Sequence, residues 1–163
     1  MYFYTIYSDG IMKNTTLNDD LLIRDYRDSD YSEIKKLWEV TDMDNPIRGD
    51  NRETIERTLK LGGKFLVLEH VSDKKVIGTS WMTYDGRRTV LHHFGILPEY
   101  QGKGLSKMLL KESFKFCKAV GAQVKLEAHA QNIKAVELYT KFGFKHLTGY
   151  NVYIIRDISK LLI

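Results

Sequence analysis

Hydrophobic and polar positions follow two different periods along this chain, and each period predicts one type of element. Residues 21–26, 64–70, 76–84 and 89–97 are apolar at every second position or almost continuously, which is typical of strands. The polar stretches SDKK and DGRR separate the last three of these segments. Short polar turns between strands predict an antiparallel meander.

Four further segments have apolar residues at helical spacing, and each follows a helix start signal. Two of the signals have the spacing of a capping box, one is a glycine-rich turn, and one is an asparagine N-cap. The start signals are Asp30 with Glu33, Asp50 with Glu53, Gly104, and Asn132. Glycines are expected to end the last three helices, at Gly62, Gly121 and Gly143.

Two more strands are predicted at residues 124–130 and 150–158, and the N-terminal residues read as a hairpin about Asp9 and Gly10. The order of elements predicts a mixed α/β (α+β) fold, with a mostly antiparallel central sheet flanked by about four helices. With 163 residues and no linker or repeat, residues 1–163 are expected to form one domain, with residues 1–20 as an N-terminal extension.

Composition excludes several classes of protein. The net charge of +4 suits an anionic ligand. The sequence has no dense block of Lys and Arg, which a nucleic-acid-binding protein would be expected to have. No apolar run is long enough to span a membrane, and a single cysteine, Cys117, forms no internal disulfide. No histidine pair has the spacing of metal ligands. We therefore expect a cytoplasmic protein without a metal.

The stretch QGKGLS, residues 101–106, joins the strand at 89–97 to the third predicted helix. A tight turn into a helix leaves backbone N–H groups unpaired at the positive end of the helix dipole, which suits an anion. A Walker A loop requires Lys-Ser/Thr after its last glycine, and a dinucleotide fingerprint requires glycine where Lys107 stands. Both nucleotide motifs fail, and a plain turn that eases helix entry stays the alternative.

QGKGLS resembles the Q/R-x-x-G-x-G/A signature of the GNAT superfamily of acetyl-CoA-dependent N-acyltransferases, with Gln101 and Gly104 matching and Ser106 replacing the final glycine or alanine. A second region, residues 126–147, resembles another conserved region of that family. The order of elements from residue 21 to about residue 157 also fits, whereas residues 1–20 lie outside the resemblance.

The resemblance implies acetyl-CoA as co-substrate, with its pyrophosphate on the amides of the glycine turn and its pantetheine arm along the edge of the preceding strand. Lys103 and Lys107 either add positive charge beside the phosphates or are solvated lysines at the helix start, and Asn132 either bonds the arm or only caps its helix. The implied cofactor-binding residues are Ile96, Leu97, Gln101, Gly102, Lys103, Gly104, Leu105, Ser106 and Asn132.

For catalysis, Tyr139 matches the residue that protonates the leaving thiolate in this family, although a core tyrosine is the alternative. The base is expected on the strand before the turn, where His92 and His93 are predicted to face opposite sides. His92 is preferred because it would share a face with Phe94 and Ile96, and a hydrogen-bonded structural histidine is the alternative for either residue. His129 and Glu127 are reserves.

The leading hypothesis is an N-acetyltransferase in which a primary amine attacks acetyl-CoA directly, since Cys117 reads as a small core residue rather than an acyl carrier. The alternatives are a catalytically silent acyl-CoA-binding or sensor module and a nucleotide-binding domain. The acceptor is a small amine or a peptide. The acidic residues Asp42, Asp44 and Asp50 either attract it or form a solvated loop, and the aromatic N-terminus leaves a homodimer open.

Overall fold

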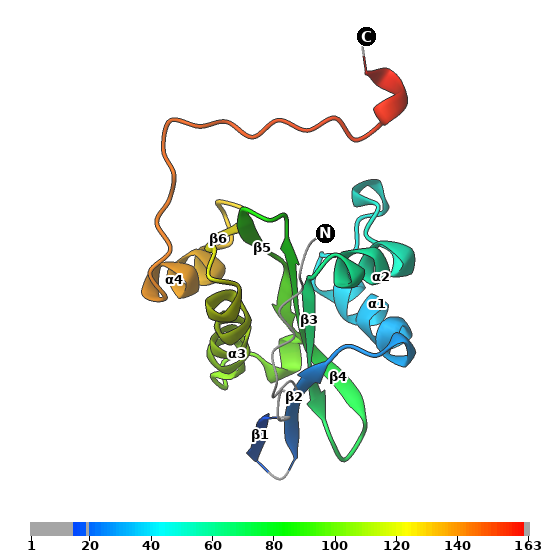
Figure 1. Cartoon of the computed structure of the whole chain (residues 1–163). Coiled ribbons are helices and arrows are strands. Elements are labelled where there is room, and N and C mark those ends of the chain that lie inside the picture. Colours follow the sequence, from blue (N-terminus) through cyan, green and yellow to red (C-terminus); the bar gives the residue numbers. More distant parts are fainter. Residues whose placement is uncertain (1–14, 19, 162–163) are drawn as a thin grey trace.

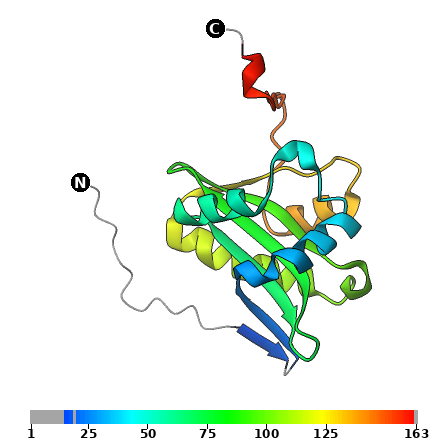
Figure 2. The ribbon, with the colours of Figure 1, turned by 90° about the vertical axis from the view of Figure 1, so that its right-hand side faces the viewer.

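The computed structural model describes residues 15–18 and 20–161, and Figures 1 and 2 show a central sheet with helices on both faces. The six strands lie in the order β1-β2-β3-β4-β5-β6. Their bounds are β1 Thr15–Asn18, β2 Leu21–Asp25, β3 Lys64–His70, β4 Lys75–Tyr84, β5 Arg88–Ile96 and β6 Gln123–Leu126. All neighbouring pairs are antiparallel except β5 and β6, which are parallel. The predicted meander and fold class are confirmed.

Two helices cover each face of the sheet (Figure 1). Helices α1 (Tyr31–Val40) and α2 (Arg52–Lys60) lie on one face, and α3 (Leu105–Val120) and α4 (Ile133–Lys141) lie on the other. Figure 2 shows α1 and α2 in front of the strands and α3 behind them. A parallel β5–β6 pair requires a crossover, and α3 supplies it.

The core on the α1 side is built from stacked aromatic rings. Trp38, Phe65 and Trp81 have ring centroids 5.8–6.2 Å apart and planes within 12° of one another. All three side chains are at most 2% exposed, so their large apolar area is removed from water almost completely. Trp81 Nε1 donates to Thr58 Oγ1 of α2 at 2.9 Å, which leaves no indole N–H unpaired there.

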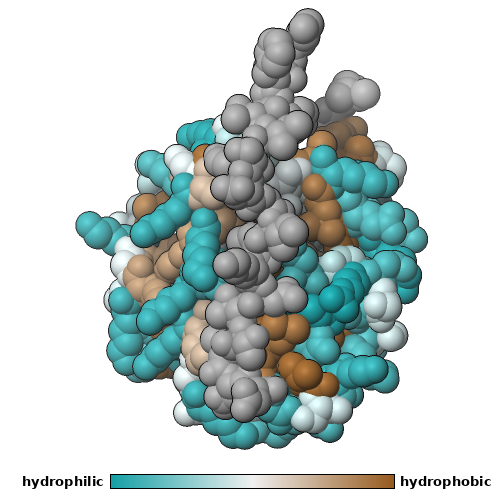
Figure 3. All heavy atoms as spheres, turned by 60° about the horizontal axis from the view of Figure 1, so that its bottom comes forward, coloured by the Kyte–Doolittle hydropathy of each residue, from teal (hydrophilic) through white to brown (hydrophobic). Residues whose placement is uncertain are grey.

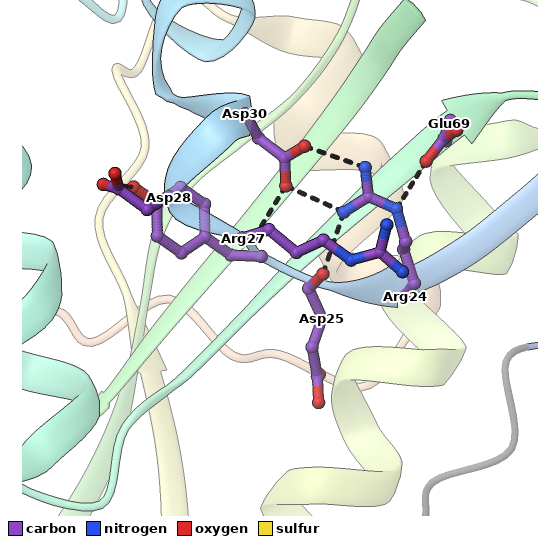
Figure 4. A network of polar contacts seen from close by, with 7 residues as sticks. Arg24, Asp25, Arg27, Asp28, Asp30 and Glu69 are labelled. Carbon is purple, nitrogen blue, oxygen red and sulfur yellow. Dashed lines mark hydrogen bonds and ion pairs between the residues drawn. The ribbon is translucent and has the colours of Figure 1, made fainter. Parts of the chain in front are cut away.

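Helix α1 begins where the sequence predicts, but Asp30 does not cap it with its side chain. The Asp30 carboxylate instead binds the buried Arg24 guanidinium through two hydrogen bonds of 2.7 and 2.8 Å, as Figure 4 shows. It also accepts from the backbone N–H of Arg27, and Glu69 pairs with Arg24 from the other side. This network fixes β2 against β3 and the start of α1.

Helix α2 also has a different N-cap from the one predicted. Asn51 accepts from the backbone N–H of Thr54 at 2.9 Å, so Asp50 is not the capping residue. The Asp50 carboxylate is therefore not used by the helix that follows it.

Two predictions for the C-terminal third are wrong. Strand β6 ends at Leu126 rather than at residue 130, and residues 150–158 form no strand. Figure 1 shows the chain after α4 running apart from the sheet, and residues 150–158 pair with none of the strands in the described part of the chain. Alternating apolar residues form a strand only where a partner strand is in reach, and here Tyr153, Ile154 and their neighbours are exposed. The predicted hairpin about Asp9 and Gly10 lies outside the described residues.

The face shown in Figure 3 is mainly hydrophilic, with hydrophobic atoms in smaller patches between the polar side chains. Within residues 15–18 and 20–161, no helix has both the length and the apolar character to cross a membrane.

Candidate functional site

The glycine turn lies between β5 and α3, as the sequence predicts. Gly102 and Gly104 have φ angles of +77° and +80°, a backbone conformation that L side chains rarely adopt. A Cβ atom built on either glycine would meet no atom within 4 Å. The glycines are therefore required by the backbone conformation, and the space beside the turn is open.

Five consecutive N–H groups in this turn, those of residues 102–106, donate to no described residue. The first N–H groups with intrachain acceptors after them are those of Lys107 and Met108, both bonded to Gly104 O. Unpaired N–H groups at the N-terminus of a 16-residue helix form a site for an anion. Lys103 Nζ lies 5.1 Å from the centre of the Tyr100 ring, at the edge of the same turn.

Strand β5 has a free edge next to this turn. It pairs with β6 only from Arg88 to Leu91, so no strand formed by the described residues lies beside residues 92–96 on that side. Leu97 N–H donates to Ile77 O of β4, which directs the N–H of Ile96 toward the free edge because neighbouring residues alternate. Gln101 Nε2 donates to Ile96 O at 2.9 Å and ties the turn to the strand. The side chains of Ile96 and Leu97 are buried, so these residues offer only backbone groups, and Leu97 N–H is already bonded.

Tyr139 lies on α4 and faces this free edge. Its ring meets Phe94 of β5 edge-on at 6.1 Å and Phe144 at 5.7 Å. Burial raises the pKa of the Tyr139 phenol to about 12, so the hydroxyl keeps its proton at neutral pH. No described residue is hydrogen-bonded to this hydroxyl. Asn132 caps α4 by accepting from Ala135 N–H at 3.2 Å.

The predicted alternation of His92 and His93 is wrong. Ser80 of β4 faces two residues of β5, His93 and Phe94, which is a β-bulge. The extra residue resets the alternation, so both histidine rings lie beside Trp81, at 5.9 and 5.5 Å. His92 therefore shares a face with His93, whereas Phe94 points to α4 on the other face. The reason for preferring His92, a face shared with Phe94, is wrong.

His92 is largely buried and hydrogen-bonded. Its Nε2 atom lies 3.0 Å from Thr83 Oγ1. Burial lowers the pKa of the His92 imidazole, with Glu127 opposing that shift and Lys125 adding to it. The side chain is therefore neutral at pH 7 and able to accept a proton.

Cys117 lies on the buried face of α3 and is 5% exposed. Burial raises the pKa of its thiol to about 11, which leaves almost no thiolate at neutral pH. We expect Cys117→Ala to keep kcat within about twofold, with some loss of stability from the deleted sulfur. A steady-state assay on protein of unchanged circular dichroism checks this. A tenfold loss of kcat with the fold intact would favour an acyl-cysteine.

No group of three or more His, Cys, Asp or Glu side chains is clustered as a metal site requires, as far as the described part of the chain extends.

The chain has a mixed sheet in which β5 and β6 separate beside a glycine-rich turn from strand to helix. This arrangement is typical of the GNAT acetyltransferase fold. The model of the Acetyltransferase (GNAT) family matches residues 22–144, well over half of the chain. The chain therefore belongs to the acetyltransferase (GNAT) family.

Solved structures agree on the fold. An acetyltransferase from Streptococcus agalactiae 2603 has a TM-score of 0.72 at 21% identity, over 85% of this chain and 93% of that one. The protein yncA from Salmonella typhimurium with its cofactor acetyl-CoA has a TM-score of 0.65 at 23% identity, over 77% and 79%. The ribosomal-protein-S18-alanine N-acetyltransferase from Escherichia coli has a TM-score of 0.66 at 19% identity, over 78% and 79%.

The bulge is the feature that sequence reasoning missed. Nothing in the pattern of VLHHFG marks an extra residue, because a strand with and without a bulge has the same apolar composition. The sequence also does not predict the position of Asp50 against this bulge, since that position depends on how the α1–α2 connection packs on the sheet.

Proposed function

We propose that this protein transfers an acetyl group from acetyl-CoA to a primary amine by direct attack of the amine. The observation that carries the proposal is the run of five unpaired backbone N–H groups, residues 102–106, beside the free edge of β5. A phosphorylated ligand with a peptide-like arm satisfies both features at once. The Salmonella relative named above holds acetyl-CoA on the same fold.

In this proposal, the pyrophosphate binds the amides of Gly102, Gly104 and their neighbours, and Lys103 and Ser106 add a charge and a hydroxyl. The pantetheine arm pairs with backbone groups near Ile96, whose N–H faces the free edge. Leu97 and Leu105 contribute to the site through the backbone they shape, since their side chains are buried.

The amine attacks the thioester carbon, so a C–N bond forms and the C–S bond breaks. His92 is proposed to take the proton that the attacking amine loses. The phenol of Tyr139 gives its proton to the departing thiolate, and a backbone N–H near Ile96 stabilises the oxyanion. Tyr139 suits this role because its phenol is protonated at neutral pH and has no described hydrogen-bond partner to displace.

Two measurements test the proposal. Calorimetry with acetyl-CoA and with ATP is expected to show binding of acetyl-CoA only. A thiol-release assay across small amines, amino acids and peptides with free N-termini is expected to show turnover with at least one of them. Binding of ATP without acetyl-CoA would overturn the proposal. Binding of acetyl-CoA without turnover of any amine would favour a silent acyl-CoA-binding module.

We expect Gly104→Ala to raise the Kd for acetyl-CoA about tenfold, because the new Cβ enters the open space at the turn and the residue must hold a φ of +80°. Gly86→Ala is the matched control. Gly86 has a φ of +84° and equally open surroundings, but it lies in the β4–β5 turn. The two variants should lose similar stability, and only Gly104→Ala should weaken binding. If Gly104→Ala and Gly86→Ala bound acetyl-CoA with equal Kd values, the glycine turn would not be part of the acetyl-CoA site.

A further inference from the structure

His93 has the strained backbone of the bulge. Its φ angle is +41°, which a side chain with a Cβ adopts at a cost, and in the described residues only Asp42 and Lys74 share this feature. Those two are exposed loop residues, whereas the His93 side chain is 4% exposed within a strand. Strain of this kind persists only where the surrounding structure holds it.

A chain of side-chain contacts holds the bulge. Trp38 Nε1 donates to Thr79 Oγ1 at 3.2 Å, and Thr79 Oγ1 donates to His93 O at 2.7 Å. The His93 ring also packs on Trp38 with centroids 4.1 Å apart and on Trp81 at 5.5 Å. The ring therefore has one fixed position on the α1–α2 face of the sheet.

Both nitrogens of this ring are buried, and neither makes a hydrogen bond of normal geometry: the groups nearest to them are the backbone of Met43 and the carboxylate of Asp50. Burial without a hydrogen bond is costly for a polar group, so Nε2 is expected to donate to a neighbouring acceptor. One carboxylate lies near: Asp50 Oδ2 is 3.5 Å from Nε2. A small side-chain rotation closes that distance to a hydrogen bond.

Asp50 has no other described task. It does not cap α2, and its side chain is 25% exposed, so one side meets the histidine and the other is open. Burial raises the pKa of the Asp50 carboxyl, while the positive charges of Arg48 and Arg156 act against that shift. A carboxylate that is partly exposed to solvent binds a cation that brings its own hydrogen bonds.

The groups around His93 keep it neutral. Burial lowers the pKa of the imidazole to about 4, and the charges of His92 and Arg48 act in the same direction. The backbone of Met43 and the carboxylate of Asp44 act against them. Asp44 is itself paired with Lys35, which leaves Asp50 as the carboxylate available to a ligand.

This pair lies on the opposite side of the free β5 edge from Tyr139. Phe94, the second bulge residue, meets Tyr139 on the α4 side, and His93 meets Asp50 on the α1–α2 side. The bulge thus lies between the two groups. An amine held at Asp50 reaches the strand edge from the face opposite the proposed acid.

We infer that Asp50 binds the ammonium group of the acceptor amine and that neutral His93 is a positioning residue, donating from Nε2 to Asp50 Oδ2. The inference rests on the proposed function, since it names the acceptor site of that reaction. It predicts that the acceptor binds as an alkylammonium ion whose positive charge faces the Asp50 carboxylate, and that this ion releases one proton to solvent before attack, so that the neutral amine of the proposed reaction is formed.

The test uses n-butylammonium chloride as the probe and two isosteric variants of one segment, Asp50→Asn and Asp42→Asn. In NMR spectra of the wild-type protein, n-butylammonium is expected to shift the His93 ring resonances in a saturable way, and ring ¹⁵N shifts should report the Nε2–H tautomer. Asp50→Asn should weaken the probe's binding at least tenfold, and the exposed Asp42→Asn should leave it unchanged.

A second pair of variants addresses the histidine. His93→Gln keeps an N–H donor near Nε2 and should retain the probe's binding within about threefold, whereas His93→Leu should lose it. Probe affinity that is equal in Asp50→Asn and wild type, or an Nδ1–H tautomer directed at Met43, would overturn the inference. If n-butylammonium binding depended on Asp50 but the protein acetylated no amine, the cation site would be supported and the proposed function would be wrong.

Discussion

Replacing Tyr139 by phenylalanine is expected to lower kcat about 1000-fold, because the variant keeps the ring but loses the proton donor for the departing thiolate. The ring contacts with Phe94 and Phe144 are preserved, so the fold and the Kd for acetyl-CoA should change little. Steady-state kinetics, with acetyl-CoA binding measured separately by calorimetry, check both parts.

Tyr84→Phe is the matched control for this change. The hydroxyl of Tyr84 donates to Gly86 O in an exposed turn, away from α4, and removing this hydroxyl should leave kcat unchanged. The pH profile adds a second readout: with the pKa of Tyr139 at about 12, the phenol stays protonated up to pH 10, and this group should cause no alkaline fall in the wild-type rate below that value. A Tyr139→Phe protein with full kcat would remove the acid role.

Replacing Asp30 by asparagine is expected to lower the free energy of unfolding by about 3 kcal/mol, since it leaves the buried Arg24 guanidinium without its two-point partner. Urea unfolding at pH 7 measures the change. Asp28→Asn is the matched control, because the Asp28–Arg52 ion pair is exposed and should contribute less than about 1 kcal/mol. Equal losses in the two variants would contradict this account of the network.

The pH dependence of the Asp30 contribution has a definite sign. Burial alone would raise the pKa of this carboxyl, but hydrogen bonds from Arg24 and from the backbone of Arg27 outweigh it and the pKa is lowered. A carboxyl with a lowered pKa in the folded state contributes stability at neutral pH and loses it as the pH falls through the folded-state value. The difference in stability between wild type and Asp30→Asn should therefore narrow below about pH 4.

The proposed site combines local and long-range features, and they differ in how far sequence predicts them. The glycine turn is local: Gly102, Gly104 and the helix that follows lie within a few residues, so spacing alone indicates unpaired amides at a helix start. The Asp50–His93 pair joins residues 43 positions apart across two elements, and no local pattern indicates it.

The helix start signals at Asp30 and Asp50 predict the positions of α1 and α2 correctly, but neither carboxylate caps its helix. Asp30 stands where a helix begins, yet its carboxylate binds Arg24, because a buried guanidinium forms stronger hydrogen bonds than a helix-start N–H. Asp50 stands one residue before the actual N-cap, Asn51. Capping preferences describe a helix in isolation, whereas the tertiary structure brings competing partners to the same side chain.

The sequence by itself determined the β3–β4–β5 meander, all four helices and the glycine turn, because hydrophobic period and turn residues act over short distances. Only the tertiary structure decided three features: the two-for-one bulge at His93, the loss of pairing beyond Leu91 and the absence of a strand at residues 150–158. Each depends on which backbone groups find a partner on a distant segment, and a strand's own residues do not encode whether that partner is in reach.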